Sequence, residues 1–361
     1  MGRRIAISGF GRTGRMAFRA FWVKRPDEIE VVAINDPAGE HTGALLLEYD
    51  SNYGRFPATV RDHDRYIHVD DVRIPVVRER DWSRIDWREL GVHTVLECSG
   101  KGTTRERAAT HLAAGAEMVI ISAPAKGDDA TFVMGVNEHT YKPGKHRVVS
   151  NGSCTTNCLA PVAAVLKDAF GLKWGMLTTV HAYTNSQSLT DRSGKDPRES
   201  RAAGLNIIPT ETGAARALGR VLPDLEGRFD GMAFRVPTAT VSTIDFVCET
   251  EVPVTKGEVN DAFRRAASCD RLRGILGVSE KPLVSMDFRG DERSAVVDVP
   301  STMVLNNRIV KVVAWYDNEW GYACRLIDLA AYIARADEAD QPTTSRTRIA
   351  SNGRVSSAIA R

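Results

Sequence analysis

Three features that mark other classes of protein are missing from this chain of 361 residues. No apolar run approaches the roughly 20 residues that a membrane-spanning helix needs. Neither charge dominates, because 48 Lys and Arg stand against 46 Asp and Glu for a net charge of +2, so no strong field favours nucleic acid or an anionic membrane. The first residues, Met1 to Arg4, are basic, but the strand-like run 5–8 follows them where a secretory signal has a longer apolar block.

Paired or clustered cysteines are also missing. The six cysteines are scattered over the chain, which is not the pattern of a disulfide framework, and we expect a reducing cytoplasm. Cys154 and Cys158 have the spacing of metal ligands, but no second pair and no histidine cluster accompanies them. We therefore expect no metal, no nucleic-acid partner and no membrane partner.

The arrangement of periodic segments divides the chain in two. In the first half, strand-like runs at 4–8, 29–34, 94–97 and 118–122 alternate with helical patterns at 14–24 and 103–114. This alternation predicts an α/β, Rossmann-type doubly wound parallel sheet over residues 1–153. Longer β-type runs then follow at 232–236, 240–250, 295–299 and 309–315, with one clear helix at 256–267. They predict an α+β domain with a mixed or antiparallel sheet over 154–318, then a last helix at 322–334 and a polar, disordered tail over 337–361.

A glycine-rich turn lies directly after the first strand. It reads Gly9-Phe10-Gly11-Arg12-Thr13-Gly14 and opens an amphipathic helix, where glycines let the backbone approach a pyrophosphate. Asp36 ends the second strand, at the distance where an acidic side chain meets a ribose 2′-hydroxyl. A carboxylate there repels a 2′-phosphate, which favours NAD over NADP. The plainer interpretation is a tight strand–helix turn with an incidental aspartate.

Cys154 is the candidate nucleophile. Ser153 is a good N-cap for the apolar helical stretch that runs to Phe170, so Cys154 falls in the first turn. The helix dipole and free N–H groups there should lower the pKa of the thiol. His181 ends a β-type run and is the candidate base, although most histidines are structural and most cysteines beside a cap are packing residues. Cys158 lies one turn deeper and is assigned to packing.

Five motifs, in order along the chain, together resemble the phosphorylating glyceraldehyde-3-phosphate dehydrogenase family over residues 3–336. They are Ser153-Cys154-Thr155-Thr156-Asn157-Cys158, His181-Ala182-Tyr183-Thr184-Asn185, Pro209-Thr210-Glu211-Thr212-Gly213-Ala214-Ala215, Arg235-Val236-Pro237-Thr238 and Trp315-Tyr316-Asp317-Asn318-Glu319-Trp320-Gly321. The resemblance implies that Cys154 adds to an aldehyde, that His181 pairs with the thiolate and takes the hydroxyl proton, and that phosphate cleaves the thioester.

The resemblance also assigns binding roles. It implies that Asn318 and Ser122 line a nicotinamide pocket and that Arg12 and neighbouring amides hold the pyrophosphate. Two anion sites are implied as well, one for the substrate's phosphate and one for the attacking phosphate, drawn from Ser153, Thr155, Thr184, Thr212, Gly213 and Arg235. The loop 182–205 resembles one that reaches a neighbouring subunit, which implies a homotetramer, and the helix 319–336 is expected to dock on the NAD domain.

Some positions depart from the family pattern. Glu199 replaces a usual arginine of the anion sites, and Ser186 replaces a usual aspartate. An anion in place of a cation reverses the local electrostatic interaction with phosphate, unless Arg192 or Arg198 compensates. Tyr53, in place of a usual histidine, is a smaller change. Three hypotheses stay open. The first is ordinary phosphorylating oxidation of glyceraldehyde 3-phosphate. The second is a paralogue that acts on another small phosphorylated or anionic aldehyde, hydrolyses the thioester with water like the erythrose-4-phosphate dehydrogenases, resists an inhibitor or serves a specialised pathway, and the third is a non-catalytic binding protein.

Overall fold

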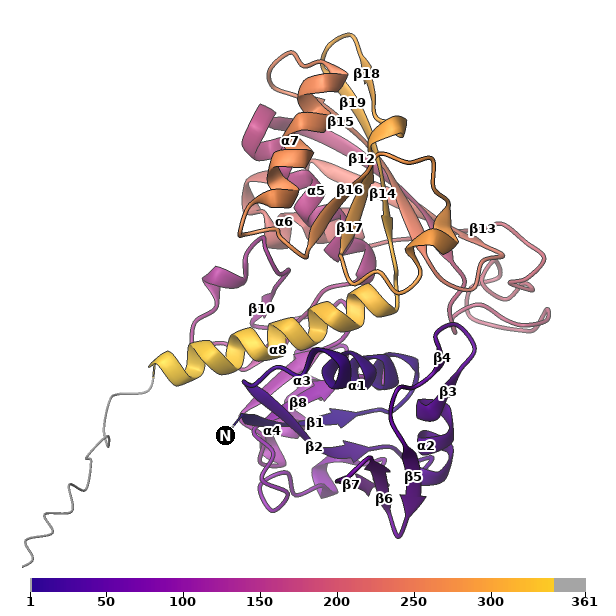
Figure 1. Ribbon diagram of the computed structural model, residues 1–361, viewed down its shortest axis with the longest axis vertical. Coiled ribbons are helices and arrows are strands. Elements are labelled where there is room, and N and C mark those ends of the chain that lie inside the picture. The colour runs from indigo at the N-terminus through magenta and orange to yellow at the C-terminus, as the bar shows by residue number, and fades with distance from the viewer. Residues whose placement is uncertain (1, 341–361) are drawn as a thin grey trace, which may run out of the picture.

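The computed structural model describes residues 2–340 and contains two large β-sheets, one in each half of the molecule (Figure 1). The first sheet has nine strands in the order β10-β11-β9-β8-β1-β2-β7-β6-β5. They are β1 (Arg3–Ser8), β2 (Ile29–Asn35), β5 (Val60–His63), β6 (Tyr66–Val69), β7 (Val72–Val77), β8 (Thr94–Glu97), β9 (Met118–Ile121), β10 (Ala130–Thr131) and β11 (Val148–Ser150). All pair in parallel except the β5–β6–β7 meander.

The central strands of this sheet are buried on both faces, which is why they read as continuous apolar runs. Their helices are α1 (Arg12–Lys24), α2 (Glu40–Glu48), α3 (Arg105–Ala108) and α4 (Thr110–Ala113), with the short pair β3 (Tyr49–Asp50) and β4 (Gly54–Arg55) after α2. The single helix predicted over 103–114 is wrong in detail. The segment is two short helices that meet at Ala109, where ψ is −13°, and the antiparallel meander over 60–77 was not predicted.

The second sheet has eight strands in the order β13-β14-β12-β15-β19-β17-β16, with β18 beside β19. They are β12 (Leu172–Ala182), β13 (Ile208–Glu211), β14 (Phe229–Val236), β15 (Ser242–Thr250), β16 (Leu276–Ser279), β17 (Ala295–Asp298), β18 (Met303–Leu305) and β19 (Ile309–Tyr316). The sheet is mixed, because β12 pairs in parallel with β14 and antiparallel with β15. Helices α5 (Cys154–Phe170), α6 (Ala214–Val221) and α7 (Lys256–Ser268) lie together beside this sheet (Figure 1).

Single turns of 3-10 helix complete the described chain: η1 (Trp82–Arg84), η2 (Glu138–Thr140), η3 (Pro223–Leu225), η4 (Ser285–Phe288) and η5 (Val299–Ser301). Within residues 2–340, no helix combines the length and the apolar character that crossing a bilayer demands.

Helix α8 (Trp320–Asp340) returns from the second sheet to the first and packs along α1 (Figure 1). Its apolar side chains, Leu326, Ile327 and Ile333 among them, are buried in the same core as Ile5 and Met16. The helix continues to Asp340, so the prediction of a disordered tail from residue 337 is wrong for 337–340. Contacts from distant parts of the chain hold this end of the helix: Arg3 Nη1 lies 2.6 Å from the Asp337 carboxylate, and the Tyr141 hydroxyl donates to it at 2.7 Å. Residues 341–361 of the predicted tail lie outside the described residues.

A small polar contact joins the two sheets' domains beside the glycine-rich turn. Tyr53, from the β3–β4 connection, donates to Asp317 Oδ1 at 2.7 Å and lies 3.0 Å from Thr240 Oγ1. Asn52 Nδ2 donates to Glu319 at 3.1 Å. Because Asp317 and Glu319 flank Asn318, this contact fixes one wall of the cleft described next.

Candidate functional site

The glycine-rich turn has the geometry of a phosphate-binding loop. Two of its glycines are required by packing: a Cβ on Gly9 would lie 2.4 Å from Ser99 Cα, and a Cβ on Gly14 would lie 2.1 Å from the Gly9 carbonyl oxygen. A Cβ on Gly11, in contrast, would meet nothing within 4 Å. Gly11 is also the N-cap of α1 and offers no side-chain cap, so the helix N-terminus faces open space where a pyrophosphate fits.

Asp36 is held against this turn. Its Oδ2 accepts a hydrogen bond from the Phe10 backbone N–H at 3.0 Å, and its Oδ1 accepts from Ala38 N at 2.8 Å. The Phe10 side chain is buried in the core, so only its backbone is available to the site. The carboxylate at the end of β2 thus stands beside the phosphate-binding turn, as binding of a ribose hydroxyl requires.

The Arg12 guanidinium does not stand free in the cleft. Its Nη1 lies 2.6 Å from Asp50 Oδ2 and its Nε lies 2.7 Å from Glu319 Oε1. Arg12 and Thr13 still line the cleft. In the described structure, Asp50 and Glu319 occupy most of the N–H donors of Arg12. The pyrophosphate contact that the sequence predicts for Arg12 therefore competes with these two ion pairs.

Asn318 lines the same cleft and is 8% exposed. Ser242 Oγ donates to Asn318 Oδ1 at 2.9 Å, and accepts from Ala182 N at 3.0 Å. This fixes the orientation of the amide, because Oδ1 is occupied and Nδ2 remains as the donor toward the cleft. Ser122 also lines the cleft, and its Oγ donates to the Glu97 carbonyl.

The candidate nucleophile and base meet in this cleft, whose volume is about 860 Å³. Ser153 caps α5, since its Oγ accepts from Thr156 N at 2.9 Å. Cys154 Sγ lies 3.4 Å from His181 Nε2, and His181 is the last residue but one of β12. A thiol and an imidazole at this distance can exchange a proton, which is the arrangement that activates a cysteine nucleophile.

The predicted lowering of the Cys154 pKa is wrong for the pair as it stands. Burial raises the pKa of the thiol, and the opposing effects of Arg235 and of the N–H groups at the start of α5 are smaller. Burial and the Arg235 charge also lower the pKa of His181 to about 3. Burial therefore outweighs the helix N-terminus in setting the pKa of this thiol.

The residues expected at the anion sites are only partly gathered. Thr184 and Ser153 line the cleft with Cys154. Arg235 approaches it through His181, with Nη1 at 2.6 Å from Nδ1. The Thr155 hydroxyl is buried and bonded to Tyr316 at 2.9 Å.

Thr212 and Gly213 lie at the start of α6, outside the residues that line this cleft. Thr212 Oγ1 accepts from Ala214 N at 3.2 Å. No group of three or more His, Cys, Asp or Glu within the described part of the chain is arranged to hold a metal ion.

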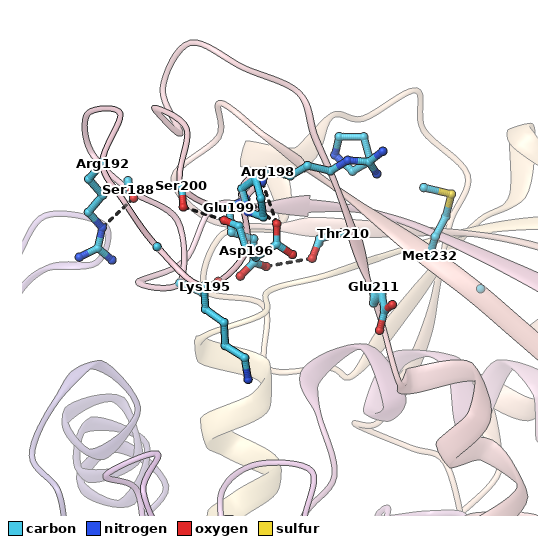
Figure 2. A pocket seen from close by; sticks show the side chains of 15 residues that line it. Ser188, Arg192, Lys195, Asp196, Arg198, Glu199, Ser200, Thr210, Glu211 and Met232 are labelled. Carbon is cyan, nitrogen blue, oxygen red and sulfur yellow. Dashed lines mark hydrogen bonds between the residues drawn. The ribbon is translucent and has the colours of Figure 1, made fainter.

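The loop that carries Glu199 has its own polar network (Figure 2). Glu199 Oε1 accepts from Thr210 Oγ1 at 2.9 Å and from Gln187 Nε2 at 3.4 Å. Gln187 Nε2 also donates to Ser186 Oγ at 2.7 Å, while its Oε1 accepts from Thr184 N at 2.8 Å. Glu199 and Ser186 are thus connected through the buried side-chain amide of Gln187.

Compensation by Arg192 or Arg198 is not visible in this network. Arg192 Nε donates to Ser188 Oγ at 2.9 Å, and the Arg198 side chain points away from Glu199 (Figure 2). Sequence reasoning missed Gln187 and Ser242. Neither belongs to a recognisable motif, and only the folded loop and the pairing of Ser242 with Tyr316 across β15 and β19 reveal them.

Comparison with known proteins gives consistent matches over both halves. Residues 3–105 match the family model described as glyceraldehyde 3-phosphate dehydrogenase, NAD binding domain, and residues 153–318 match its C-terminal domain. The chain is 54% identical to glyceraldehyde-3-phosphate dehydrogenase of Geobacillus stearothermophilus over 92% of this chain and 99% of that protein. It is 52% identical to glyceraldehyde-3-phosphate dehydrogenase 1 of Bacillus subtilis (strain 168), over 93% of this chain and 99% of that protein. The second enzyme of that strain is 47% identical, over 92% and 96%.

Proposed function

The chain belongs to the glyceraldehyde-3-phosphate dehydrogenase family, and we propose that it oxidises glyceraldehyde 3-phosphate with NAD and inorganic phosphate to 1,3-bisphosphoglycerate. The observation that carries this proposal is the Cys154 Sγ to His181 Nε2 contact of 3.4 Å, in a cleft that Asn318 also lines. A nucleophile, a base and a cofactor-orienting amide around one cavity suit covalent aldehyde oxidation.

Cys154 Sγ adds to the aldehyde carbon while its thiol proton passes through His181 Nε2 to the carbonyl oxygen, which gives a thiohemiacetal. His181 Nε2 takes the hydroxyl proton as the C–H bond breaks, which leaves a thioester. NAD, when bound, supplies the hydride acceptor. Phosphate oxygen then attacks the thioester carbon, and the C–S bond breaks. This releases the acyl phosphate and a thiolate that takes back the proton held on His181.

The binding roles follow from what each side chain has free. Asn318 offers Nδ2 to the carboxamide of the cofactor, because Ser242 occupies its Oδ1. The open space at Gly11 takes the pyrophosphate, and Asp36 takes the ribose hydroxyls. Thr184 and Arg235 are assigned to the phosphate of the substrate. Ser153, Thr212 and Gly213 are assigned to the attacking phosphate.

The same family assignment supports a wider set of proposals, namely a homotetramer, a cytoplasmic location and a role in glycolysis. Exposed apolar side chains on the loop and its end support the homotetramer: Leu189 is 91% exposed, Leu205 84% and Ile207 68%. Apolar side chains grouped in this way are typical of a subunit interface. All six cysteines are free thiols, which suits a reducing compartment.

The alternative acceptor suggested by Glu199 and Ser186 is not favoured by relatives with about 50% identity that carry the dehydrogenase name. Steady-state kinetics over a small panel of phosphorylated aldehydes, each with and without phosphate, tests the choice directly. We expect NADH formation from glyceraldehyde 3-phosphate to require phosphate or arsenate. Turnover that ignores both anions, or that prefers another aldehyde, would contradict the proposal.

Two variants assign the chemistry. Cys154→Ser should abolish turnover, and Cys269→Ser is the matched control because Cys269 is exposed and lies away from the cleft. Iodoacetate should alkylate Cys154 faster than the other five cysteines, because His181 Nε2 lies 3.4 Å from its sulfur and can take the thiol proton as the S–C bond forms. Equal labelling of all six together with no turnover would favour the non-catalytic binding protein.

A further inference from the structure

The loop after β8 lies beside the glycine-rich turn, at the point where the strand order of the first sheet reverses. Strand β1 is followed along the sheet by β2 on one side, whereas β8 is followed by β9 on the other. Open α/β sheets bind their ligands at such a point, outside the carboxyl ends of the strands. The backbone of Ser99 packs on the turn itself, because a Cβ on Gly9 would lie 2.4 Å from Ser99 Cα. Residues 98–102 therefore form a second wall of the crevice that takes the dinucleotide.

This loop is built around Glu97, the last residue of β8, whose side chain is 1% exposed. Its Oε1 accepts from the Ser99 backbone N–H at 3.0 Å and from the Ser99 hydroxyl. That hydroxyl accepts in turn from Lys101 N at 3.1 Å. The Glu97 carbonyl oxygen accepts from the N–H of Ser122 at 3.0 Å and from its hydroxyl at 2.9 Å, and Ser122 lines the cleft. Glu97 thus fixes two segments that face the cofactor.

A buried imidazole holds the other oxygen of this carboxylate. His111 on α4 is fully buried, and its Nε2 lies 3.1 Å from Glu97 Oε2. Its Nδ1 accepts from Trp87 Nε1 at 3.1 Å. An indole N–H only donates, so Nδ1 carries no proton and the neutral ring carries its proton on Nε2. Trp87 therefore selects the tautomer in which His111 donates to Glu97.

The Glu97 carboxylate depends on these donors. Within residues 2–340 its ion-pair partner is His111, and no lysine or arginine lies at that distance. A buried carboxylate without a cation is stable only when hydrogen bonds satisfy its oxygens. Gly102 packs against the same side chain, since a Cβ there would lie 2.6 Å from Glu97 Cγ. A Glu97 side chain that turned away from its missing partner would therefore displace the loop.

We propose that His111 is a positioning residue for NAD. Through the hydrogen bond from Nε2 to Glu97 it holds Ser99 against the glycine-rich turn, so that the crevice is formed before the cofactor arrives. A preformed wall lowers the ordering cost of binding and leaves the chemistry of Cys154 unchanged. The inference rests on the assignment of this domain to NAD and is independent of which aldehyde is oxidised.

The test is calorimetric titration of NAD into the full-length protein without aldehyde. His111→Phe keeps an aromatic ring beside Trp82, whose ring stacks on His111 at 4.5 Å, and removes the N–H donor. It should weaken NAD binding about tenfold, which corresponds to about 1.4 kcal/mol. His111→Gln should restore most of the affinity, because its amide can both donate to Glu97 and accept from Trp87.

His146→Phe is the matched control in the same domain. His146 packs against Phe132 at 5.7 Å, and its Nδ1 accepts from Lys142 N at 3.1 Å, on the loop before β11. This variant should leave the affinity for NAD unchanged even if it melts at a lower temperature. Equal weakening by the two histidine-to-phenylalanine variants would refute the positioning role, and so would a His111→Gln variant that binds NAD no better than His111→Phe.

A measurement on the wild type needs no variant to fold. Nitrogen NMR of the protein labelled at histidine should show the His111 proton on Nε2 at pH 7, and a proton on Nδ1 would overturn the proposal.

Kinetics separate positioning from general damage to the cleft. In His111→Phe the KM for NAD should rise while kcat changes little, and iodoacetamide should alkylate Cys154 at the wild-type rate without NAD. A slower alkylation would place the effect at the nucleophile and contradict the proposal. Titration, NMR and alkylation use no aldehyde, so failure to oxidise glyceraldehyde 3-phosphate would count against the proposed function and not against the role of His111.

Discussion

Replacing Tyr53 by Phe tests how the cofactor domain is held against the wall that carries Asn318. The hydroxyl of Tyr53 donates to Asp317 Oδ1 at 2.7 Å and lies 3.0 Å from Thr240 Oγ1. Burial and the charge of Asp317 raise the pKa of Tyr53 far above its usual value, so the hydroxyl stays a donor. The ring itself packs against Trp320 at 6.1 Å, and Phe preserves that contact.

The expected loss of stability depends on Asp317, the hydrogen-bond partner of the Tyr53 hydroxyl. Asp317 is 1% exposed, and a hydrogen bond to a charged group contributes about 1.5–3 kcal/mol to stability. The carboxylate keeps the N–H groups of Trp320 at 2.9 Å and Gly290 at 2.8 Å, so it is not left unpaired. We therefore expect the lower part of that range, about 1.5–2 kcal/mol in the free energy of unfolding.

Urea titration followed by circular dichroism measures this loss. Tyr332→Phe is the matched control, because Tyr332 packs against the same core and its hydroxyl makes no hydrogen bond within residues 2–340. The control should change the free energy of unfolding by less than about 0.5 kcal/mol. Equal losses in the two variants would refute the role assigned to the Tyr53 hydroxyl.

Four further variants address the cofactor turn, the domain contact and the loop. Gly11→Ala should fold normally and weaken NAD binding at least about tenfold. Gly14→Ala should lower the unfolding temperature, because its Cβ would lie 2.1 Å from a backbone oxygen. Equal behaviour of the two variants in NAD titration and thermal melting would contradict this. Arg12→Met should lower the free energy of unfolding by about 2–3 kcal/mol, because it leaves the Asp50 carboxylate, whose side chain is 2% exposed, without its cation. Although burial opposes it, Arg12 and the N–H groups of Asn52 and Tyr53 lower the pKa of Asp50. This stabilisation is present above the unfolded pKa near 3.9 and is lost as pH falls through the lowered value, so the difference between wild type and variant in urea titrations should shrink below about pH 4. Glu199→Gln keeps an acceptor for Thr210 and removes a negative charge. At separations on the order of 10 Å, repulsion between that charge and phosphate is roughly 1–1.5 kcal/mol, so the KM for phosphate should fall about five- to twelvefold. An unchanged KM would show that Glu199 does not act on the anion site.

Residues whose role depends on local sequence were predicted well. The glycine-rich turn, the Ser153 cap and the sheet classes follow from patterns within a few residues, and the structure has the turn, the cap and both sheets. The family resemblance was confirmed by the comparisons. These features are short-range or are shared with many relatives.

Features that depend on tertiary contacts were not predictable in the same way. The pKa of Cys154 depends on burial that no flanking residue reveals. The amide orientation of Asn318 depends on Ser242, 76 residues away. Glu199 is bonded to Thr210 and Gln187, a pairing that the loop creates only when folded. The last helix extends to Asp340, and its Asp337 binds Arg3 and Tyr141, which lie far away in the sequence.

The central claim is that a thioester on Cys154 is formed by oxidation and cleaved by phosphate. Rapid-quench mass spectrometry of the intact protein, mixed with NAD and glyceraldehyde 3-phosphate, measures this directly. Without phosphate we predict one acyl group per chain, on Cys154, together with a single burst of NADH. With phosphate the adduct should disappear as NADH formation continues. An adduct that never forms, or one that decays equally fast without phosphate, would contradict the account.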